Sequence, residues 1–206
     1  MKKRTILTIL MAIAFLQACT PTYKWKEPNW HKYAINEYCI PNEVIISSIN
    51  SKTDDTKLLW HCTFKSPDEL RIKEDRNKEK FETIAREHGE TGEGFYSYPG
   101  YVSCLYQVEK IEIVGFKGKS ESLLSPQFSY WFYSIEGFIK SGYKRNKMND
   151  IEEGNLGAIG KMDFLDMEYG LTISYPKSKM EDKFDRIELR VILKDGKVLH
   201  CDMPLK

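Results

Sequence analysis

Two histidine–cysteine pairs, His61-Cys62 and His200-Cys201, bring together residue types that could bind a metal or act as base and nucleophile. Zinc sites commonly use a C-x₂-C spacing, and the chain contains none. Adjacent residues on a strand also point to opposite faces, so neither pair can converge on one ion. The sequence therefore predicts no metal site.

Other catalytic patterns are equally weak. Neither H-E-x-x-H nor G-x-S-x-G occurs, and the S-x-x-K matches at Ser141 and Ser174 lack the companion S-D-N and K-T-G elements. Asp163 and Asp166 are close enough in sequence to resemble a pair of glycosidase carboxylates, but a chain with 30 acidic residues contains many such pairs. We expect no catalytic residues and no cofactor. A hydrolase acting on glycan or peptide is the alternative.

The first 18 residues have the composition of a secretory signal peptide. Residues 2–4 are basic, residues 6–16 are apolar with one exception, and Ala18 precedes Cys19. A basic region, an apolar region and a small residue before the cleavage point are typical of a signal peptide in this order. The apolar run is shorter than the ~20 residues that a membrane-spanning helix needs.

The tetrapeptide Leu16-Gln17-Ala18-Cys19 resembles the bacterial lipobox, in which Leu and a small residue precede an invariant cysteine. The resemblance implies that the Cys19 thiol carries a diacylglycerol, that the chain is cut before Cys19 and that the new amino group is acylated. Several acyl chains hold a protein stably on a membrane. Because residues 20–24 contain no acid, the resemblance further implies a cell-envelope protein in the outer membrane that faces the periplasm.

Lipidation of Cys19 leaves four cysteines, which are Cys39, Cys62, Cys104 and Cys201. An even number of cysteines in an exported chain predicts two disulfide bonds. Three pairings of the four cysteines are open, and the sequence selects none of them.

The charge of the chain is nearly balanced. Without residues 1–18, which hold three basic and no acidic residues, 28 Lys and Arg stand against 30 Asp and Glu. Nucleic-acid-binding proteins need a basic face, so this balance argues against nucleic acid as a partner. The length suits one globular domain, which we expect over residues 37–206, after a tether over residues 19–36.

Alternating and β-branched apolar residues predict strands over much of this domain. We expect strands over residues 43–49, 58–64, 101–114, 167–175, 184–193 and 197–203. Asp195-Gly196 is a strong turn signal between the last two strands, and a two-residue loop there pairs Val191 with His200. In that register His200 lies in the core and Cys201 lies on the opposite face.

Helical patterns are fewer. An apolar face predicts a helix over residues 77–88, which Gly89 ends, whereas residues 125–139 fit either a helix or a strand. Six strands with one or two helical insertions favour a mainly β protein, an antiparallel β-sandwich of the Ig-like or a related type; an α+β domain is the alternative. The pattern is loosely similar to uncharacterised small lipoproteins of gut anaerobes that have sandwich folds.

Exposed aromatic residues can stack on sugars or fill pockets of a partner. Tyr96, Tyr98, Trp131 and Tyr133 are the candidates for such a surface, and the alternative is that these rings build the core. We therefore expect a lipid-anchored, non-catalytic binding or scaffolding module. We expect the N-terminal lipid to hold this module on the membrane and the module to bind an envelope protein or a glycan.

Overall fold

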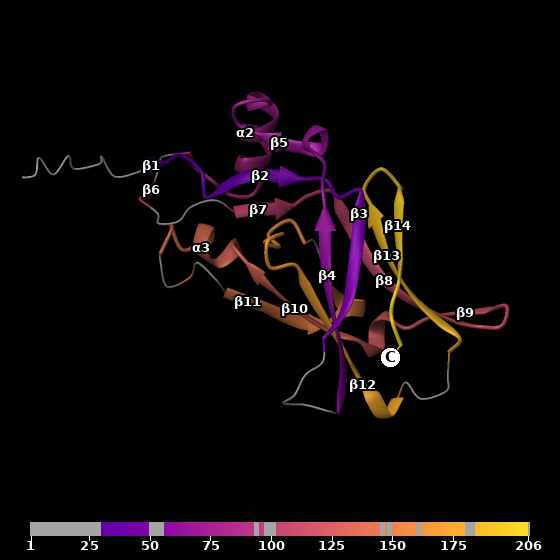
Figure 1. Ribbon diagram of the computed structural model, residues 1–206. Coiled ribbons are helices and arrows are strands. Elements are labelled where there is room, and N and C mark those ends of the chain that lie inside the picture. Colours follow the sequence, from indigo (N-terminus) through magenta and orange to yellow (C-terminus); the bar gives the residue numbers. More distant parts are fainter. Residues whose placement is uncertain are drawn as a thin grey trace, which may run out of the picture.

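About half of the residues that the structure describes lie in strands, and most of these strands make two main sheets (Figure 1). The computed structural model describes residues 30–49, 56–92, 95–96, 102–144, 147, 150–159, 162–179 and 184–205. The predicted signal peptide, Cys19 and most of the predicted tether lie outside the described residues. Within the described residues, no helix combines the length and the apolar composition needed to cross a membrane.

The larger sheet has five antiparallel strands in the order β11-β10-β12-β4-β3. These strands are β3 Glu43–Ile49, β4 Lys57–Lys65, β10 Ser129–Ser134, β11 Asp150–Asn155 and β12 Leu171–Pro176. The second sheet has the order β14-β13-β8-β9. Its strands are β8 Val108–Lys117, β9 Ser120–Leu123, β13 Arg186–Leu193 and β14 Val198–Asp202. The predicted mainly β, antiparallel sandwich is confirmed.

Two smaller sheets and two helices adjoin the sandwich. One small sheet has the order β5-β2-β7, with β2 Ile35–Cys39, β5 Arg71–Lys73 and β7 Val102–Leu105. The other pairs β1 Trp30–His31 with β6 Phe95–Tyr96. The helices are α2 Lys78–Glu87 and α3 Glu136–Lys140. Short 3₁₀ turns are η1 Asp68–Leu70, η2 Ser125–Gln127, η4 Leu156–Ala158 and η5 Lys177–Lys179.

The globular fold begins before residue 37. Ala34 and Ile35 are almost fully buried, and β2 starts at Ile35, inside the stretch expected to be a tether. Four of the five β2 residues are buried, so the strand lacks the alternation by which a half-exposed strand is recognised.

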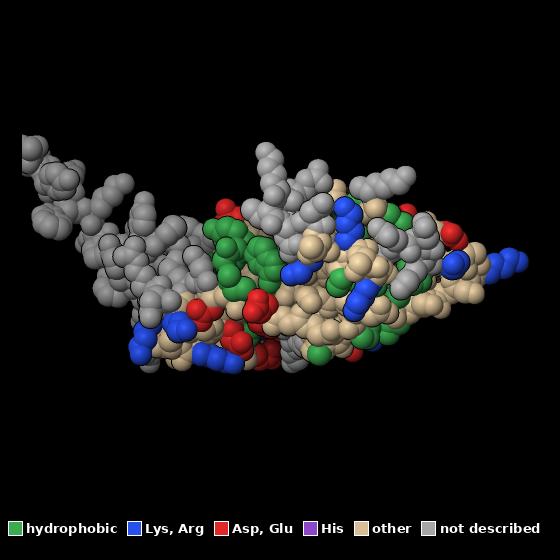
Figure 2. Space-filling model, turned by 90° about the horizontal axis from the view of Figure 1, so that it is seen from below, with side chains coloured by type: hydrophobic (Ala, Val, Ile, Leu, Met, Phe, Trp, Pro, Cys, Tyr) green, Lys and Arg blue, Asp and Glu red, His purple; other side chains and the backbone are tan. Residues whose placement is uncertain are grey.

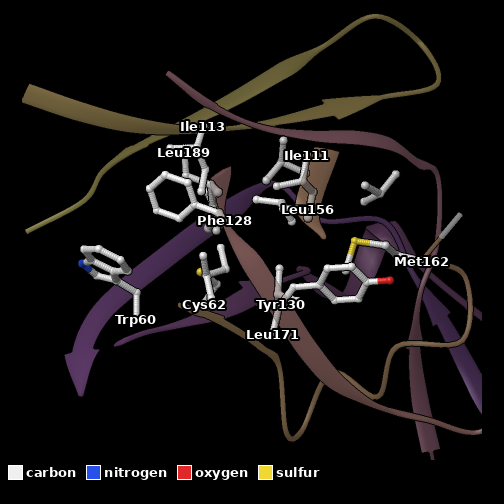
Figure 3. Close-up of a cluster of buried hydrophobic side chains, with 14 of the residues drawn as sticks. Trp60, Cys62, Ile111, Ile113, Phe128, Tyr130, Leu156, Met162, Leu171 and Leu189 are labelled. Carbon is white, nitrogen blue, oxygen red and sulfur yellow. The ribbon is translucent and has the colours of Figure 1, made fainter. Parts of the chain in front are cut away.

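Aromatic and branched side chains from both main sheets fill the space between them (Figure 3). The ring of Phe128 lies 5.9 Å from that of Trp60 and 4.4 Å from that of Tyr175, measured between centroids. The Trp60 indole N–H donates a hydrogen bond of 2.8 Å to the carbonyl of Pro204. Because a buried indole N–H needs an acceptor, this bond ties the C-terminal segment to the core.

A second apolar cluster lies between α2, α3 and the β5-β2-β7 sheet. The buried face of α2 consists of Phe81, Ile84 and Ala85, and the Phe81 ring lies 5.3 Å from that of Tyr38 on β2. The helix predicted over residues 77–88 is therefore confirmed. An amphipathic helix of this length depends on such packing for its stability.

The segment over residues 125–139 contains both alternatives that its sequence left open. The η2 turn leads into β10, and α3 follows directly.

The predicted strand over 101–114 is divided into β7 and β8. The break is at Gln107, which has a φ of 68° that interrupts strand pairing.

The loop of the β13–β14 hairpin has one residue more than predicted. Leu193 accepts a hydrogen bond from the N–H of Gly196, and its own N–H donates to the carbonyl of Lys197. Gly196 has a φ of 84°. A type I turn followed by a left-handed glycine is the usual geometry of a three-residue hairpin loop.

One additional loop residue turns every side chain of β14 to the opposite face. Leu189 pairs with Cys201, which packs against the sandwich core, and Arg190 pairs with His200, which is exposed. The prediction that His200 is a core residue and that Cys201 lies on the other face is therefore wrong.

The four cysteines are unbonded in the structure, which contradicts the two predicted disulfides. Cys39 and Cys104 lie on neighbouring strands, but the register partner of Cys104 is Tyr38, so the two thiols point to opposite faces. Cys62 and Cys201 both face the sandwich core as thiols. Burial raises the pKa of both groups, which keeps them in the unreactive protonated form.

Candidate functional site

The outer face of the five-stranded sheet presents a row of aromatic and apolar side chains. On β4, Trp60 and Cys62 point into the core, so the residues between and beside them point outward. We call this outward surface the aromatic face. Its members are Ile45, Ser47, Ile49, Leu59, His61, Ser129, Trp131, Tyr133, Ile151, Glu153, Thr172 and Ser174, with Tyr169 in the turn before β12.

Apolar exposure is concentrated on the aromatic face. Seven large hydrophobic residues are exposed within the part of the chain that the structure describes, and five of them lie here. Those five are Ile45, Ile49, Trp131, Ile151 and Tyr169. Figure 2 shows hydrophobic side chains gathered in a patch beside acidic side chains on one face of the molecule. Scattered exposed apolar residues are ordinary, whereas five of the seven on one face make that face the candidate interaction surface.

Three rings form the centre of the aromatic face. Trp131 and Tyr133 occupy alternate positions of β10 and meet edge to face, with centroids 6.0 Å apart. Tyr169 contacts Tyr133 with centroids 4.9 Å apart. The turn that presents Tyr169 is closed by a 3.0 Å hydrogen bond from the N–H of Gly170 to the carbonyl of Asp166. Trp131 remains 38% exposed, which leaves its ring open to a ligand.

A hollow of about 630 Å³ lies beside Trp131. Its polar lining includes the hydroxyls of Ser129 and Ser174, the carboxylate of Glu153 and the ammonium of Lys57. An aromatic wall with a few polar groups around it is the usual composition of a small-molecule site. This hollow can therefore bind a molecule that has both an apolar surface and hydrogen-bonding groups.

A second polar site lies at the C-terminal end of α2. The helix ends in a Schellman motif, in which the N–H of Gly89 donates to Arg86 and the N–H of Glu90 donates to Ala85. Gly89 has a φ of 85°, which suits the left-handed position of this motif. The sharp turn directs the side chains of His88 and Glu90 into the protein, where both are largely buried.

His88 uses both of its ring nitrogens. Nδ1 lies 2.7 Å from the carbonyl of Ile84, and Nε2 lies 3.5 Å from Oδ2 of Asp163. Because a carbonyl only accepts, Nδ1 donates, and Nε2 can donate to Asp163 only in the charged imidazolium. Burial lowers the pKa of His88, but the contacts with Asp163 and Ile84 outweigh it and raise the pKa. The rings of Tyr38 and Phe164 pack around the imidazole with centroids 5.3 and 5.0 Å away.

A pocket of about 660 Å³ opens beside His88 and Asp163, between α2, α3 and β11. Glu136 of α3 forms an ion pair with Lys140, and Glu152 of β11 lies on the same wall. Burial raises the pKa of Glu152, and the nearby charge of Glu136 raises it further. The pocket therefore contains a carboxylate whose negative charge is incompletely balanced.

The geometry of the second site favours binding over catalysis. A general base must have a free nitrogen within hydrogen-bond reach of its substrate, and both nitrogens of His88 already have partners. Among the described residues, no group of three His, Cys, Asp or Glu is arranged to hold a metal ion. Glu136 is paired with Lys140 and Asp163 faces His88, so Glu152 is the carboxylate on this wall for which the described residues show no ion pair.

The structure brings Trp131 and Tyr133 together at the surface and not in the core, which were the two alternatives, and their role in binding stays a prediction. The side chain of Tyr96 and all of Tyr98 lie outside the described residues, as does the lipidation site Cys19. Sequence analysis missed Tyr169, because it joins the other rings only through the pairing of β10 with β12. It also missed the contact between His88 and Asp163, which lie far apart in the chain.

Comparison with known proteins finds no relative. No protein-family model matches the sequence, and no curated protein and no solved structure is similar to it.

Proposed function

We propose that this chain is a lipid-anchored protein of the bacterial cell envelope whose sandwich binds a glycan through the aromatic face and catalyses no reaction. The observation that carries the proposal is the exposed Trp131 ring beside the polar hollow. The lipobox-like segment that ends at Cys19 supports the anchor. The near-neutral charge of the mature chain supports an uncharged or weakly charged ligand.

The chemistry of the hollow favours a sugar over a protein surface. A pyranose ring has an apolar C–H face that can lie on an indole, and its edge carries hydroxyls that donate and accept hydrogen bonds. Ser129, Ser174 and Glu153 line the hollow with Trp131 and carry hydroxyl and carboxylate groups that can make such bonds. A protein partner would need a larger dry centre, whereas these polar groups interrupt the apolar surface.

The same lining argues against glycan hydrolysis at this place. Glycosidases use two carboxyl groups on either side of the scissile bond. Glu153 is the one carboxylate among the described residues that line the hollow. A sugar bound there would meet hydrogen-bonding groups but no acid–base pair.

Titration with soluble oligosaccharides tests the glycan proposal. The probes are chitotetraose, maltotetraose and xylotetraose, and binding is followed by calorimetry and by tryptophan fluorescence. Replacing a central tryptophan of a binding site costs about 2 kcal/mol or more, so Trp131→Ala should weaken binding roughly thirtyfold. Leu123→Ala is the matched control, because Leu123 is exposed on β9 of the other sheet.

Two outcomes would end the glycan proposal. One is a Trp131→Ala variant that binds the probes as tightly as the unmodified protein. The other is the absence of binding to every probe together with capture of a specific envelope protein that depends on Trp131, which would assign the aromatic face to a protein partner.

Metabolic labelling with a palmitate analogue tests the anchor separately. We expect the unmodified chain to be labelled and to sediment with membranes, and Cys19→Ala to lose both properties. Labelling that persists in Cys19→Ala would refute the lipobox assignment.

A further inference from the structure

We propose that the pocket beside His88 and Asp163 is a second ligand site, separate from the aromatic face, and that it binds a small organic molecule through a primary ammonium group. The pocket lies between α2, α3 and β11 and has a volume of about 660 Å³. This volume is in the usual range for small-molecule sites and far larger than a bare ion needs.

The first argument is an unused acceptor. Asp163 is 6% exposed, and its Oδ1 atom is buried with no hydrogen-bond partner among the described residues. The other oxygen, Oδ2, faces Nε2 of His88. A buried acceptor without a partner costs about 1 to 3 kcal/mol, and more when it is charged. Asp163 also lines the pocket, so a ligand whose donor reaches Oδ1 would remove this cost.

The second argument is the sign of the charge. The described lining carries four carboxylates, of Glu87, Glu136, Glu152 and Asp163. With His88 protonated it carries three cations, the other two being Lys140 and Lys194. Lys140 is engaged with Glu136, and Lys194 lies over the ring of Tyr106 with its ammonium 5.3 Å from the centroid. A ligand with one positive charge would balance the remaining excess of negative charge.

The third argument is the wall that faces this charge. Tyr106 and Phe164 both line the pocket, and their ring centroids lie 6.3 and 5.0 Å from that of the His88 imidazole. Aromatic faces attract organic cations, and the attraction grows where water is excluded. Among the described residues, the carboxylates do not form a set of three metal ligands. The lining thus fits an ammonium group carried on an apolar body.

Benzylamine and benzyl alcohol form the probe pair, because they share the apolar ring and differ in the charged donor. Binding to the purified full chain is followed by calorimetry and by NMR of the His88 imidazole. We expect benzylammonium to bind at millimolar concentration and to shift the His88 signals, and benzyl alcohol to do neither. Loss of one charge-assisted hydrogen bond corresponds to a roughly tenfold to hundredfold weaker affinity, which we expect for Asp163→Asn.

Asp75→Asn is the matched control, because Asp75 is an exposed aspartate outside this pocket. If Asp163→Asn fails to fold, Glu152→Gln decides the question, because Glu152 is only half-buried and its substitution should leave the fold intact. We expect Glu152→Gln to weaken benzylammonium binding severalfold. Equal affinity for the amine and the alcohol would overturn the proposal, as would unchanged amine affinity in Glu152→Gln. Trp131→Ala should leave amine binding intact, so failure of this proposal is distinct from failure of the glycan proposal.

Discussion

Ionisation of Glu90 should make the protein less stable as the pH rises towards neutrality. Glu90 is 2% exposed, directly after the Schellman turn of α2. Its carboxyl oxygens accept hydrogen bonds from the N–H groups of Ala34 and Ile35, at the start of β2. The side chain therefore joins the end of a helix to a buried strand, and its charge lies in an apolar region.

The direction and size of the effect follow from the pKa of Glu90. Burial raises that pKa from its ordinary value of 4.5 to about 7, although the N–H groups of Ala34 and Ile35 lower it in part. Between these two values the folded protein binds more protons than the unfolded chain, so the free energy of unfolding falls as pH rises. The stabilising contribution is complete below pH 4.5 and is lost as pH rises through about 7. It corresponds to roughly 3 kcal/mol.

Urea denaturation at a series of pH values between about 5 and 8 measures this contribution. The Glu90→Gln variant keeps one carbonyl acceptor and removes the titrating group. We expect the stability of the unmodified protein to fall relative to Glu90→Gln by roughly 3 kcal/mol over this range. His88 remains in both proteins, but its charge lowers the pKa of Glu90, so the difference measures Glu90 together with its interaction with His88.

Glu69→Gln is the control, because Glu69 is exposed in η1. The stability of this variant should depend on pH in the same way as that of the unmodified protein. If Glu90→Gln follows the unmodified protein in parallel across the whole range, Glu90 is ionised in the folded state like an ordinary surface carboxylate. The burial argument for this residue would then be wrong.

Three further predictions concern the core. Gly115→Ala should destabilise the protein by about 1 to 3 kcal/mol in urea denaturation, because the added Cβ would lie 2.6 Å from the Phe184 ring. Trp60→Phe should cost about 1 to 3 kcal/mol in the same assay, since it removes a buried indole and leaves its carbonyl acceptor unpaired. When the native protein is alkylated without reductant, Cys201 should react before Cys62, because Cys62 is fully buried. After unfolding without reductant, both cysteines should be alkylated as free thiols, and mass spectrometry that finds either one oxidised would contradict this.

Elements with a local signature could be predicted from the sequence. The helix α2 has an apolar face and a glycine that ends it, and β4 alternates apolar and polar residues, so both were found within one or two residues of their true bounds. Several short strands were missed, and β2 and β11 were missed for opposite reasons. β2 is buried almost throughout, and β11 is an acidic edge strand that reads as a loop. Their environment, which decides their structure, is supplied by distant parts of the chain.

The hairpin error shows how a small local difference changes a whole set of side chains. The dipeptide Asp195-Gly196 fits a two-residue loop and also the last two positions of a three-residue loop. The choice between these loops decides whether His200 or Cys201 faces the core. The sequence pattern of β14 does not separate the alternatives, because hydrophobic Val198 lies on the outward face with His200.

The candidate sites were predictable only where their residues are neighbours on one strand. Trp131 and Tyr133 share a face of β10 by the two-residue period of a strand, but the sequence left open whether this segment is a strand or a helix. The contact between His88 and Asp163 depends on how α2 packs against the segment before β12. No spacing rule connects two residues on separate elements of this kind.

The two proposed sites lie on opposite faces of the same edge strand, and this provides a sharp test of both. On β11, Glu153 pairs with Trp131 and points to the aromatic face, whereas Glu152 pairs with Phe132 and points to the pocket beside His88. Glu153→Gln should weaken oligosaccharide binding and leave benzylammonium binding unchanged, and Glu152→Gln should do the reverse. The two substitutions remove the same charge from adjacent residues, so an effect of net charge or of strand stability would appear in both variants alike. Parallel losses at both sites would mean that β11 itself, and not its individual side chains, controls binding, and the assignment of two separate sites would fail.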